Sequence, residues 1–128
     1  MNSQEKITYW ISSAEHDLST AETLFGAEKY DWCLFLGHLV LEKALKALWV
    51  KQPGALPPKT HNLLLLIGNH LKISDAQKEF FENANEFNIE ARYPDEKQSF
   101  YQICTKEFAT THFLQIKEFF KWLKLQIQ

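Results

Sequence analysis

Apolar residues recur at helical spacing along the first part of the chain. Between Ile7 and Phe25 they alternate in steps of four and three residues, which places them on one face of a helix. Ser3 is a suitable cap residue at the start. Gly26 stands where the helix should end, because glycine adopts the left-handed backbone of a helix terminus without a Cβ clash. We therefore expect a first amphipathic helix.

A second apolar pattern, from Tyr30 to Val50, covers a wider face than the first. Small residues such as Gly37 and Ala44 recur along it and would let a neighbouring backbone approach closely. We expect this helix to be central. It should end before Pro53 and the glycine and prolines after it, because proline lacks the amide donor that a helix needs.

Two shorter helices are predicted next. Thr60 can cap a very apolar helix that covers His61–Ile67. Ser74 or Asp75 then opens a fourth helix, whose apolar residues keep helical spacing towards Asn88.

The last third is predicted to be a loop followed by a long helix. The segment Asn88–Ser99 has no long apolar period and contains Pro94, so we interpret it as a loop. Helical spacing returns from Tyr101 to Ile127. Together these elements predict an all-α fold over residues 1–128, a single domain built as an up-and-down four-helix bundle with an additional short helix.

Composition narrows the class of protein. The chain has 128 residues, of which 45% are hydrophobic and 23% charged, which is typical of a globular protein and argues against disorder. A net charge of -2 excludes the overall positive field of a protein that coats nucleic acid, so any RNA contact must be local. The sequence shows no signal or transit peptide and no apolar run of membrane length, so we expect a cytoplasmic protein without a membrane span.

Several kinds of chemistry are not indicated. Cys33 and Cys104 are far apart and lack the close spacing of a zinc or redox pair, so we expect buried free thiols. The sequence contains no glycine-rich phosphate loop, no G-x-S-x-G and no H-E-x-x-H. We therefore expect neither a metal site nor a cofactor.

Three segments carry a family resemblance. In chain order they read HLVLEKALKALWVKQ, PPKTHNLLLLI and EARYPDEKQSFY, and the opening WISSAEHDLSTAETLFGAEKYDWCLFLGH adds to them. With these segments at these separations, nearly the whole chain resembles the HEPN family, prokaryotic stand-alone type. The pairs Thr60-His61 and Arg92-Tyr93 with the adjoining Pro-Asp are the most specific part of the match.

The resemblance implies a helical, often homodimeric domain that binds a nucleotide or RNA, or acts with a minimal nucleotidyltransferase partner in a toxin–antitoxin-like pair. Many relatives are metal-independent endoribonucleases with an Arg and a His about four to six residues apart, which act on the RNA 2′-hydroxyl and phosphate. In this chain no histidine follows Arg92 as far as Ser99. The sequence therefore favours a binding protein over a ribonuclease.

Arg92 is the first candidate ligand-binding residue, because its guanidinium offers a planar fork to a phosphate and keeps its charge. The alternative is that Arg92 pairs with Asp95, Glu42 or another carboxylate and ties its loop to the bundle. The adjacent Tyr93 can stack on a base, or simply pack against the fold.

Two further groups of candidates come from the middle of the chain. His38, Glu42 and Lys46 are four residues apart, so they form one stripe of the second helix, either a polar groove or a set of helix-stabilising ion pairs. Thr60 and His61 stand at a predicted helix start, where free amides can receive an anion or where Thr60 merely caps.

Three hypotheses remain for the function. The first is a dimerising HEPN-like module that binds a nucleotide, RNA or a nucleotidyltransferase through Arg92 and the Glu42 stripe, without cutting RNA. The second is a divergent endoribonuclease in which His61 or His112 comes close to Arg92 and replaces the missing histidine. The third is a dimerisation module without a small-molecule site, suggested by the aromatic residues of the first and last helices.

Overall fold

In the computed structural model the described residues, 1–52 and 54–128 apart from the side chain of Ala91, form helices and no strands. The predicted all-α class is thereby confirmed. In chain order the elements, with the 3-10 turn labelled η1, are α1 (Ser3–Gly26), α2 (Tyr30–Trp49), α3 (Leu63–Ile67), α4 (Asp75–Asn85), η1 (Ile89–Ala91), α5 (Pro94–Ile103) and α6 (Lys106–Ile127).

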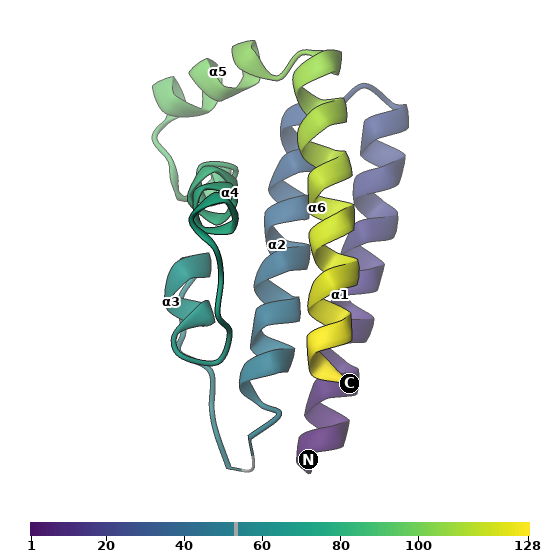
Figure 1. Ribbon diagram of the computed structural model, residues 1–128. Coiled ribbons are helices and arrows are strands. Elements are labelled where there is room, and N and C mark those ends of the chain that lie inside the picture. Colours follow the sequence, from purple (N-terminus) through teal and green to yellow (C-terminus); the bar gives the residue numbers. More distant parts are fainter. Residues whose placement is uncertain (53) are drawn as a thin grey trace.

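The long helices α1, α2 and α6 stand side by side, and the shorter helices lie beside them (Figure 1). α1 runs opposite to α2 and α6, and the two chain ends lie at the same end of the bundle. α4 is seen nearly end-on in Figure 1, so it crosses the long helices instead of running along them. The expected bundle is therefore present, with its fourth helix turned crosswise and α3 as the additional short helix.

α2 is the centre of the fold, as its wide apolar face predicted. It packs against α1, α3, α5 and α6, and Leu34, Leu41 and Leu45 are fully buried. At Gly37 the backbone passes close to α6, because a Cβ built there would lie 2.6 Å from the Cδ1 atom of Ile116. The small residues of this helix therefore allow the close approach that we expected.

The ends of α1 differ in detail from the prediction. Its cap is Asn2 instead of Ser3, since the Asn2 side chain accepts a hydrogen bond of 2.8 Å from the amide of Glu5. The helix ends at Gly26 as expected, yet the residue in the left-handed region is Glu28, with φ 63°. The reason is that one more helical hydrogen bond forms after Gly26 before the chain reverses.

The third helix also starts later than predicted. α3 begins at Leu63, and Asn62 caps it by accepting a hydrogen bond of 3.0 Å from the amide of Leu64. Thr60 instead accepts a hydrogen bond of 3.1 Å from the amide of Asn62, so it shapes the preceding turn. His61 accordingly lies outside the helix. Pro53, which we expected to help end α2, lies outside the described residues.

α4 begins as expected, with Ser74 forming a capping box with Gln77. The interpretation of Asn88–Ser99 as a loop is wrong, because this segment contains η1 and most of α5. Pro94 occupies the first turn of α5, where a missing amide donor costs nothing, and Tyr93 before it is extended. The proline that we took as a loop signal is therefore a helix start.

The predicted last helix is two helices. α5 and α6 are separated at Cys104 and Thr105, and the Thr105 hydroxyl caps α6 by accepting a hydrogen bond of 3.2 Å from the amide of Phe108. This break turns α5 across the top of the bundle (Figure 1). Within the described ranges, no helix is long and apolar enough to cross a membrane.

Candidate functional site

Two cavities meet at Arg92. The aromatic cavity has a volume of about 560 Å³ and lies between α4, α5 and α6, whereas the polar cavity has about 430 Å³ and lies beside the start of α3. The aromatic cavity is lined by Asn83, Glu86, Phe87, Arg92, Glu96, Ser99, Phe100, Ile103, Phe108 and His112. The polar cavity is lined by His61, Asn62, Asn85, Glu86, Asn88, Arg92 and Glu96.

The inner surface of the aromatic cavity is formed by phenylalanine rings. Phe87 and Phe100 are almost fully buried, so their rings are held in place by the core. The imidazole of His112 packs against Phe87 and Phe108, with ring centres 5.4 and 4.2 Å apart. Burial lowers the pKa of His112 below its usual value of 6.5, which favours the neutral ring. The cavity therefore has a largely apolar lining.

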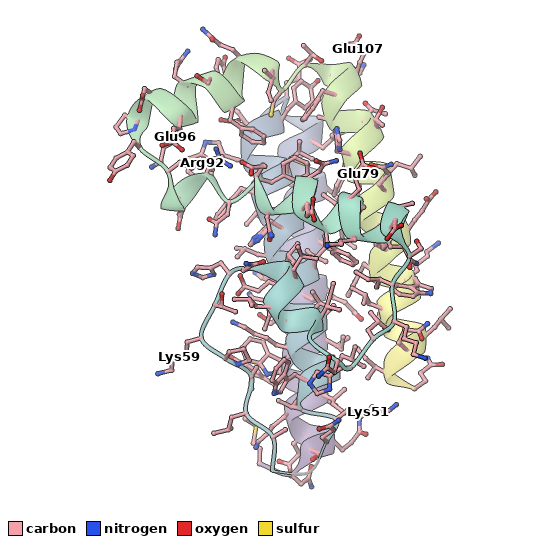
Figure 2. The ribbon with its side chains drawn as sticks, turned by 60° about the vertical axis from the view of Figure 1, so that its left-hand side comes forward. Lys51, Lys59, Glu79, Arg92, Glu96 and Glu107 are labelled. Atoms are coloured by element: carbon pink, nitrogen blue, oxygen red, sulfur yellow. The ribbon has the colours of Figure 1, made fainter. Side chains whose placement is uncertain are left out.

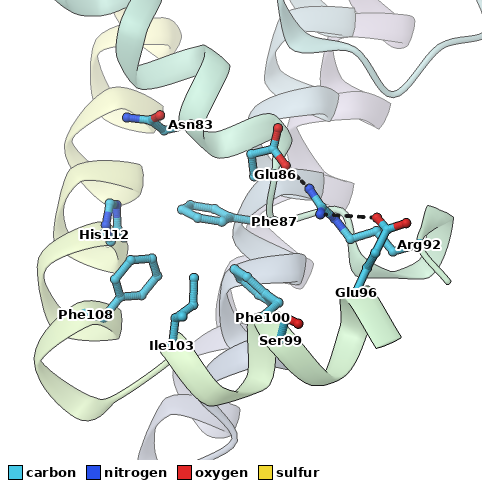
Figure 3. Close-up of a pocket in the computed structure, with 10 residues that line it drawn as sticks. All are labelled: Asn83, Glu86, Phe87, Arg92, Glu96, Ser99, Phe100, Ile103, Phe108 and His112. Carbon is cyan, nitrogen blue, oxygen red and sulfur yellow. Dashed lines mark hydrogen bonds and ion pairs between the residues drawn. The ribbon is translucent and has the colours of Figure 1, made fainter. Parts of the chain in front are cut away.

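Arg92 stands at the rim of this surface, opposite His112 and with Phe87 between them (Figure 3). Its guanidinium contacts Glu86, and its Nη1 atom lies 3.6 Å from Oε2 of Glu96. Figure 2 shows it beside Glu96, far from Lys51 and Lys59 near the other end of the molecule. Arg92 therefore forms ion pairs, as in the alternative given above. Its partners are Glu86 and Glu96, and not Asp95 or Glu42.

Those two carboxylates are much more exposed than the arginine. The side chains of Glu86 and Glu96 are 67% and 46% exposed, whereas that of Arg92 is 23% exposed. Exposed ion pairs contribute only about 0–1 kcal/mol, so water or another anion can replace either carboxylate at small cost. The guanidinium is thus available to another anion when either carboxylate moves away.

His61 in the polar cavity is oriented from behind by a buried carboxylate. Its Nδ1 atom donates a hydrogen bond of 2.8 Å to Oε1 of Glu42, a residue that is only 4% exposed. Because a carboxylate accepts, Nδ1 carries the proton, and in the neutral ring Nε2 holds the free lone pair. The second oxygen of Glu42 accepts a hydrogen bond of 3.1 Å from Lys46.

His38 holds the same segment through its backbone. Its Nε2 atom donates a hydrogen bond of 2.8 Å to the carbonyl oxygen of His61. Burial lowers the pKa of His38, although nearby Glu42, the carbonyl of His61 and the Asn85 side chain act in the opposite direction. With a carbonyl as its partner, the neutral ring carries its proton on Nε2, which leaves His38 as a buried structural donor.

Asparagines complete the polar cavity. The Asn85 carbonyl oxygen accepts a hydrogen bond of 2.9 Å from the amide of Leu63, and its amide donates one of 3.0 Å to Asn62. Asn62 also accepts from the amide of Leu64, so the first amides of α3 already have partners. An anion is therefore not needed at this helix start.

The structure brings together only some of the candidate residues. Arg92 and His61 share the polar cavity. His38, Glu42 and Lys46 do form one stripe, but it is a hydrogen-bonded layer behind His61 and not an open groove. Thr60 belongs to the turn before α3.

Tyr93 lies on the outside. It is the N-cap residue of α5, it is 75% exposed, and it is not among the described residues that line the two cavities. A role for Tyr93 beside Arg92 would require its ring to turn towards the rim.

Several residues of the site were missed by sequence reasoning. Glu96 lies four residues after Arg92, the spacing of a helical ion pair, and recognising Pro94 as a helix start would have revealed it. Glu86 and Phe87 gave no comparable signal, because they reach the cavity only through the packing of α4 against α5 and α6. Among the residues that the structure describes, no cluster of three metal-ligating side chains is present.

The three long helices with a crosswise layer of shorter helices beside them define the fold of this chain as an all-α bundle. The model of the HEPN domain matches residues 7–126, and the chain therefore belongs to the HEPN family. It is similar to the crystal structure of TT1696 from Thermus thermophilus, with a TM-score of 0.78, 20% identity, and coverage of 94% of this chain and 98% of that chain. At that identity the likeness concerns the fold alone. None of the curated proteins gives a significant match.

Proposed function

We propose that residues 1–128 act as a single HEPN domain that binds a nucleotide or a short stretch of RNA at Arg92, without cutting it. The observation that carries this proposal is the position of Arg92 on the rim shared by the aromatic and the polar cavity. A base and its phosphate need flat apolar surface next to a fixed cation.

The aromatic cavity suits a base. Its volume of about 560 Å³ lies within the ordinary range for small-ligand sites. Phe87 and Phe100 are almost fully buried behind the cavity, whereas the partly exposed Phe108 and the exposed Ile103 give a base apolar surface to contact. Asn83 and Ser99 lie at its edge and supply hydrogen-bonding groups for the rim of a base.

The charges around Arg92 determine how a phosphate can bind there. Arg92 carries one positive charge between the two negative charges of Glu86 and Glu96, so a phosphate must displace at least one carboxylate. Both carboxylates are substantially exposed and therefore weakly held. A phosphate accepts two parallel hydrogen bonds from the guanidinium, which favours the exchange.

Titration calorimetry with a panel of nucleoside monophosphates and a short unstructured RNA tests the proposal. Arg92→Ala should weaken binding at least about tenfold, and Arg92→Lys should restore it only in part because the fork is lost. Glu86→Gln should act in the opposite direction and tighten binding, since it removes a competing negative charge. The RNA must remain intact after each titration.

Lys51→Ala is the matched control, because this exposed lysine lies far from Arg92, near the other end of the molecule (Figure 2). Thermal melting of each variant separates loss of binding from loss of folding. Equal affinity in the wild type and in a folded Arg92→Ala variant would overturn the proposal, as would the absence of saturable binding to every ligand tested.

A second candidate function is supported by the histidines. His61 shares the polar cavity with Arg92, and His112 shares the aromatic cavity with it. The Nε2 lone pair of His61, backed by Glu42, can take the proton of an RNA 2′-hydroxyl while that oxygen attacks the adjacent phosphorus. Arg92 would stabilise the charge on the phosphate oxygens.

In that reaction the bond from phosphorus to the 5′-oxygen breaks, and the leaving oxygen takes a proton from solvent. The products would be a 2′,3′-cyclic phosphate and a 5′-hydroxyl. Incubation with end-labelled RNA distinguishes this candidate from simple binding. Cleavage that disappears in both His61→Ala and Arg92→Ala would favour the ribonuclease, whereas cleavage that persists in His61→Ala would exclude His61 as the base.

Homodimer formation and a nucleotidyltransferase partner belong to the same proposal. HEPN domains often form dimers, which supports the first of these. Of the aromatic residues that we expected to mark an interface, Phe119 stacks on Phe80 with ring centres 4.0 Å apart and Trp122 packs on Phe119, whereas Tyr9 of α1 is 55% exposed. Sedimentation velocity over a range of concentrations tests the dimer.

A further inference from the structure

A third cavity lies between the start of α2 and α5 and shares no lining residue with the two at Arg92. Its volume is about 430 Å³. We name it the Trp32 cavity, after the residue in the first turn of α2 that forms part of its wall. On the opposite element, Pro94 and Tyr101 belong to α5, so the cavity exists only where these two helices come together.

Two exposed aromatic rings line this cavity. Trp32 is 42% exposed and Tyr101 is 60% exposed, so much of each large aromatic residue is in contact with solvent. Trp32 contacts Phe35 edge-on, with ring centres 5.9 Å apart, so the ring has support from the core on one side. Exposed aromatic rings from two elements in one hollow are the usual platform for a stacked base.

The charges around the rings favour a phosphate. Lys29 and Lys97 line the cavity together with one acidic residue, Asp31, which leaves a local charge of +1 in a chain of net charge -2. Within the described part of the chain neither lysine forms an ion pair, in contrast to Arg92 with its two carboxylates. Cations next to aromatic rings are the combination that binds single-stranded nucleic acid.

We propose that the Trp32 cavity binds one base of a single-stranded nucleic acid and its adjoining phosphate. The base stacks on Trp32 and Tyr101, the two lysines meet the phosphate, and the carboxylate of Asp31 can accept hydrogen bonds from the base edge. This site extends the proposed function beyond Arg92, and it rests on that function only for the class of ligand.

Fluorescence anisotropy with labelled oligouridylate, oligoadenylate and the matching DNA strands tests the site. Trp32→Ala should weaken oligonucleotide binding about tenfold, as expected for the loss of one stacking platform. Lys29→Ala combined with Lys97→Ala should weaken it as well, and should lower the steepness of log K against log salt by about 0.7, the value for one phosphate contact on a single strand.

The controls are exposed residues of the same types elsewhere. Tyr9 on α1 is 55% exposed, and Lys121 lies on the outside of α6. Tyr9→Ala and Lys121→Ala should leave oligonucleotide affinity unchanged. The lysine pair tests the site even if Trp32→Ala proves poorly folded, because surface lysines contribute little to stability.

The outcomes separate this inference from the binding at Arg92. Mononucleotide affinity should depend on Arg92 and not on Trp32 or the lysine pair. Oligonucleotide affinity that is unchanged in the folded Trp32 and lysine variants, or reduced equally by the controls, would overturn the inference. If Arg92→Ala leaves nucleotide affinity unchanged while the lysine pair still weakens oligonucleotide binding, the result supports the Trp32 cavity and contradicts the Arg92 site.

Discussion

The Oε1 atom of Glu42 lies 2.8 Å from the Nδ1 atom of His61, and this contact joins the centre of α2 to the segment that leads into α3. The two side chains differ greatly in exposure, at 6% for Glu42 and 66% for His61. A buried carboxylate thus fixes the orientation of an imidazole that faces solvent. Lys46 on the same carboxylate completes a buried charge pair.

Glu42→Gln should destabilise the fold by about 3 kcal/mol, because Lys46 then remains a largely buried cation without its partner. Urea denaturation measures the change in the free energy of unfolding. Glu79→Gln on the exposed surface of α4 is the matched control and should change it by less than about 0.5 kcal/mol. Equal stability of the two variants would contradict the buried pair.

Gly37→Ala should destabilise the protein by about 1–2 kcal/mol, even though alanine is the better helix former by about 1 kcal/mol. The added Cβ would lie 2.6 Å from Cδ1 of Ile116, which is fully buried and has little room to move. Adding Ile116→Val removes that Cδ1 atom, so the double variant should recover part of the loss.

The control for this pair is Gly26→Ala, since no atom lies within 4 Å of a Cβ built at that position. It should be neutral or slightly stabilising. Thermal melting of the three variants and the wild type in one buffer measures the effects. A double variant that is no more stable than Gly37→Ala alone would show that the contact with Ile116 is not the cause.

Stability should fall as the pH is lowered because of His38. Burial lowers the pKa of His38 in the folded protein below its usual value of 6.5, so the unfolded chain takes up the proton first. The free energy of unfolding therefore has its full value above about pH 6.5. Below that pH, protonation of His38 in the unfolded chain lowers it by up to about 1.4 kcal/mol per pH unit. His112 contributes with the same sign and is less buried.

Urea melts at several pH values compare the slopes of stability against pH. His38→Gln should flatten the slope below about pH 6.5, whatever its effect on the absolute stability. Ser19→Ala, at an exposed position of α1 without a titratable side chain, should leave the slope unchanged. The same slope in the wild type and His38→Gln would assign the pH dependence to other groups.

The two cysteines should be inert in the folded protein. Burial raises the pKa of Cys33 and of Cys104 to about 12, and both thiols are free. Relative to an ordinary thiol this lowers the reactive thiolate roughly a thousandfold. A disulfide reagent at about pH 8 should therefore label neither cysteine until denaturant is added, when both should react. Fast labelling of the native protein would contradict the burial of these thiols.

Sequence reasoning was most successful where the structure depends on neighbours along the chain. The extent of α2, the end of α1 at Gly26 and the Ser74 cap of α4 were all predicted, because helical periodicity and capping act over a few residues. The main local error was Pro94, since a proline can mark either a loop or the first turn of a helix, depending on the residues after it.

The candidate site was predicted less completely. Arg92 and His61 were both singled out, and they share a cavity. The stripe of Glu42 was also recognised, yet it could not be placed inside or outside the fold, because the spacing of residues on a helix does not define which neighbour covers them.

By itself the sequence determined the all-α class, the HEPN family and the faces of the long helices, since these follow from periodicity and local motifs. Only the tertiary structure decided three contacts. Glu42 accepts a hydrogen bond from His61, Glu86 pairs with Arg92, and Trp32 lines a cavity together with residues of α5. Those contacts depend on how far each helix is rotated and tilted against its neighbours. That rotation is set by the packing of the whole core, and no short stretch of sequence contains it.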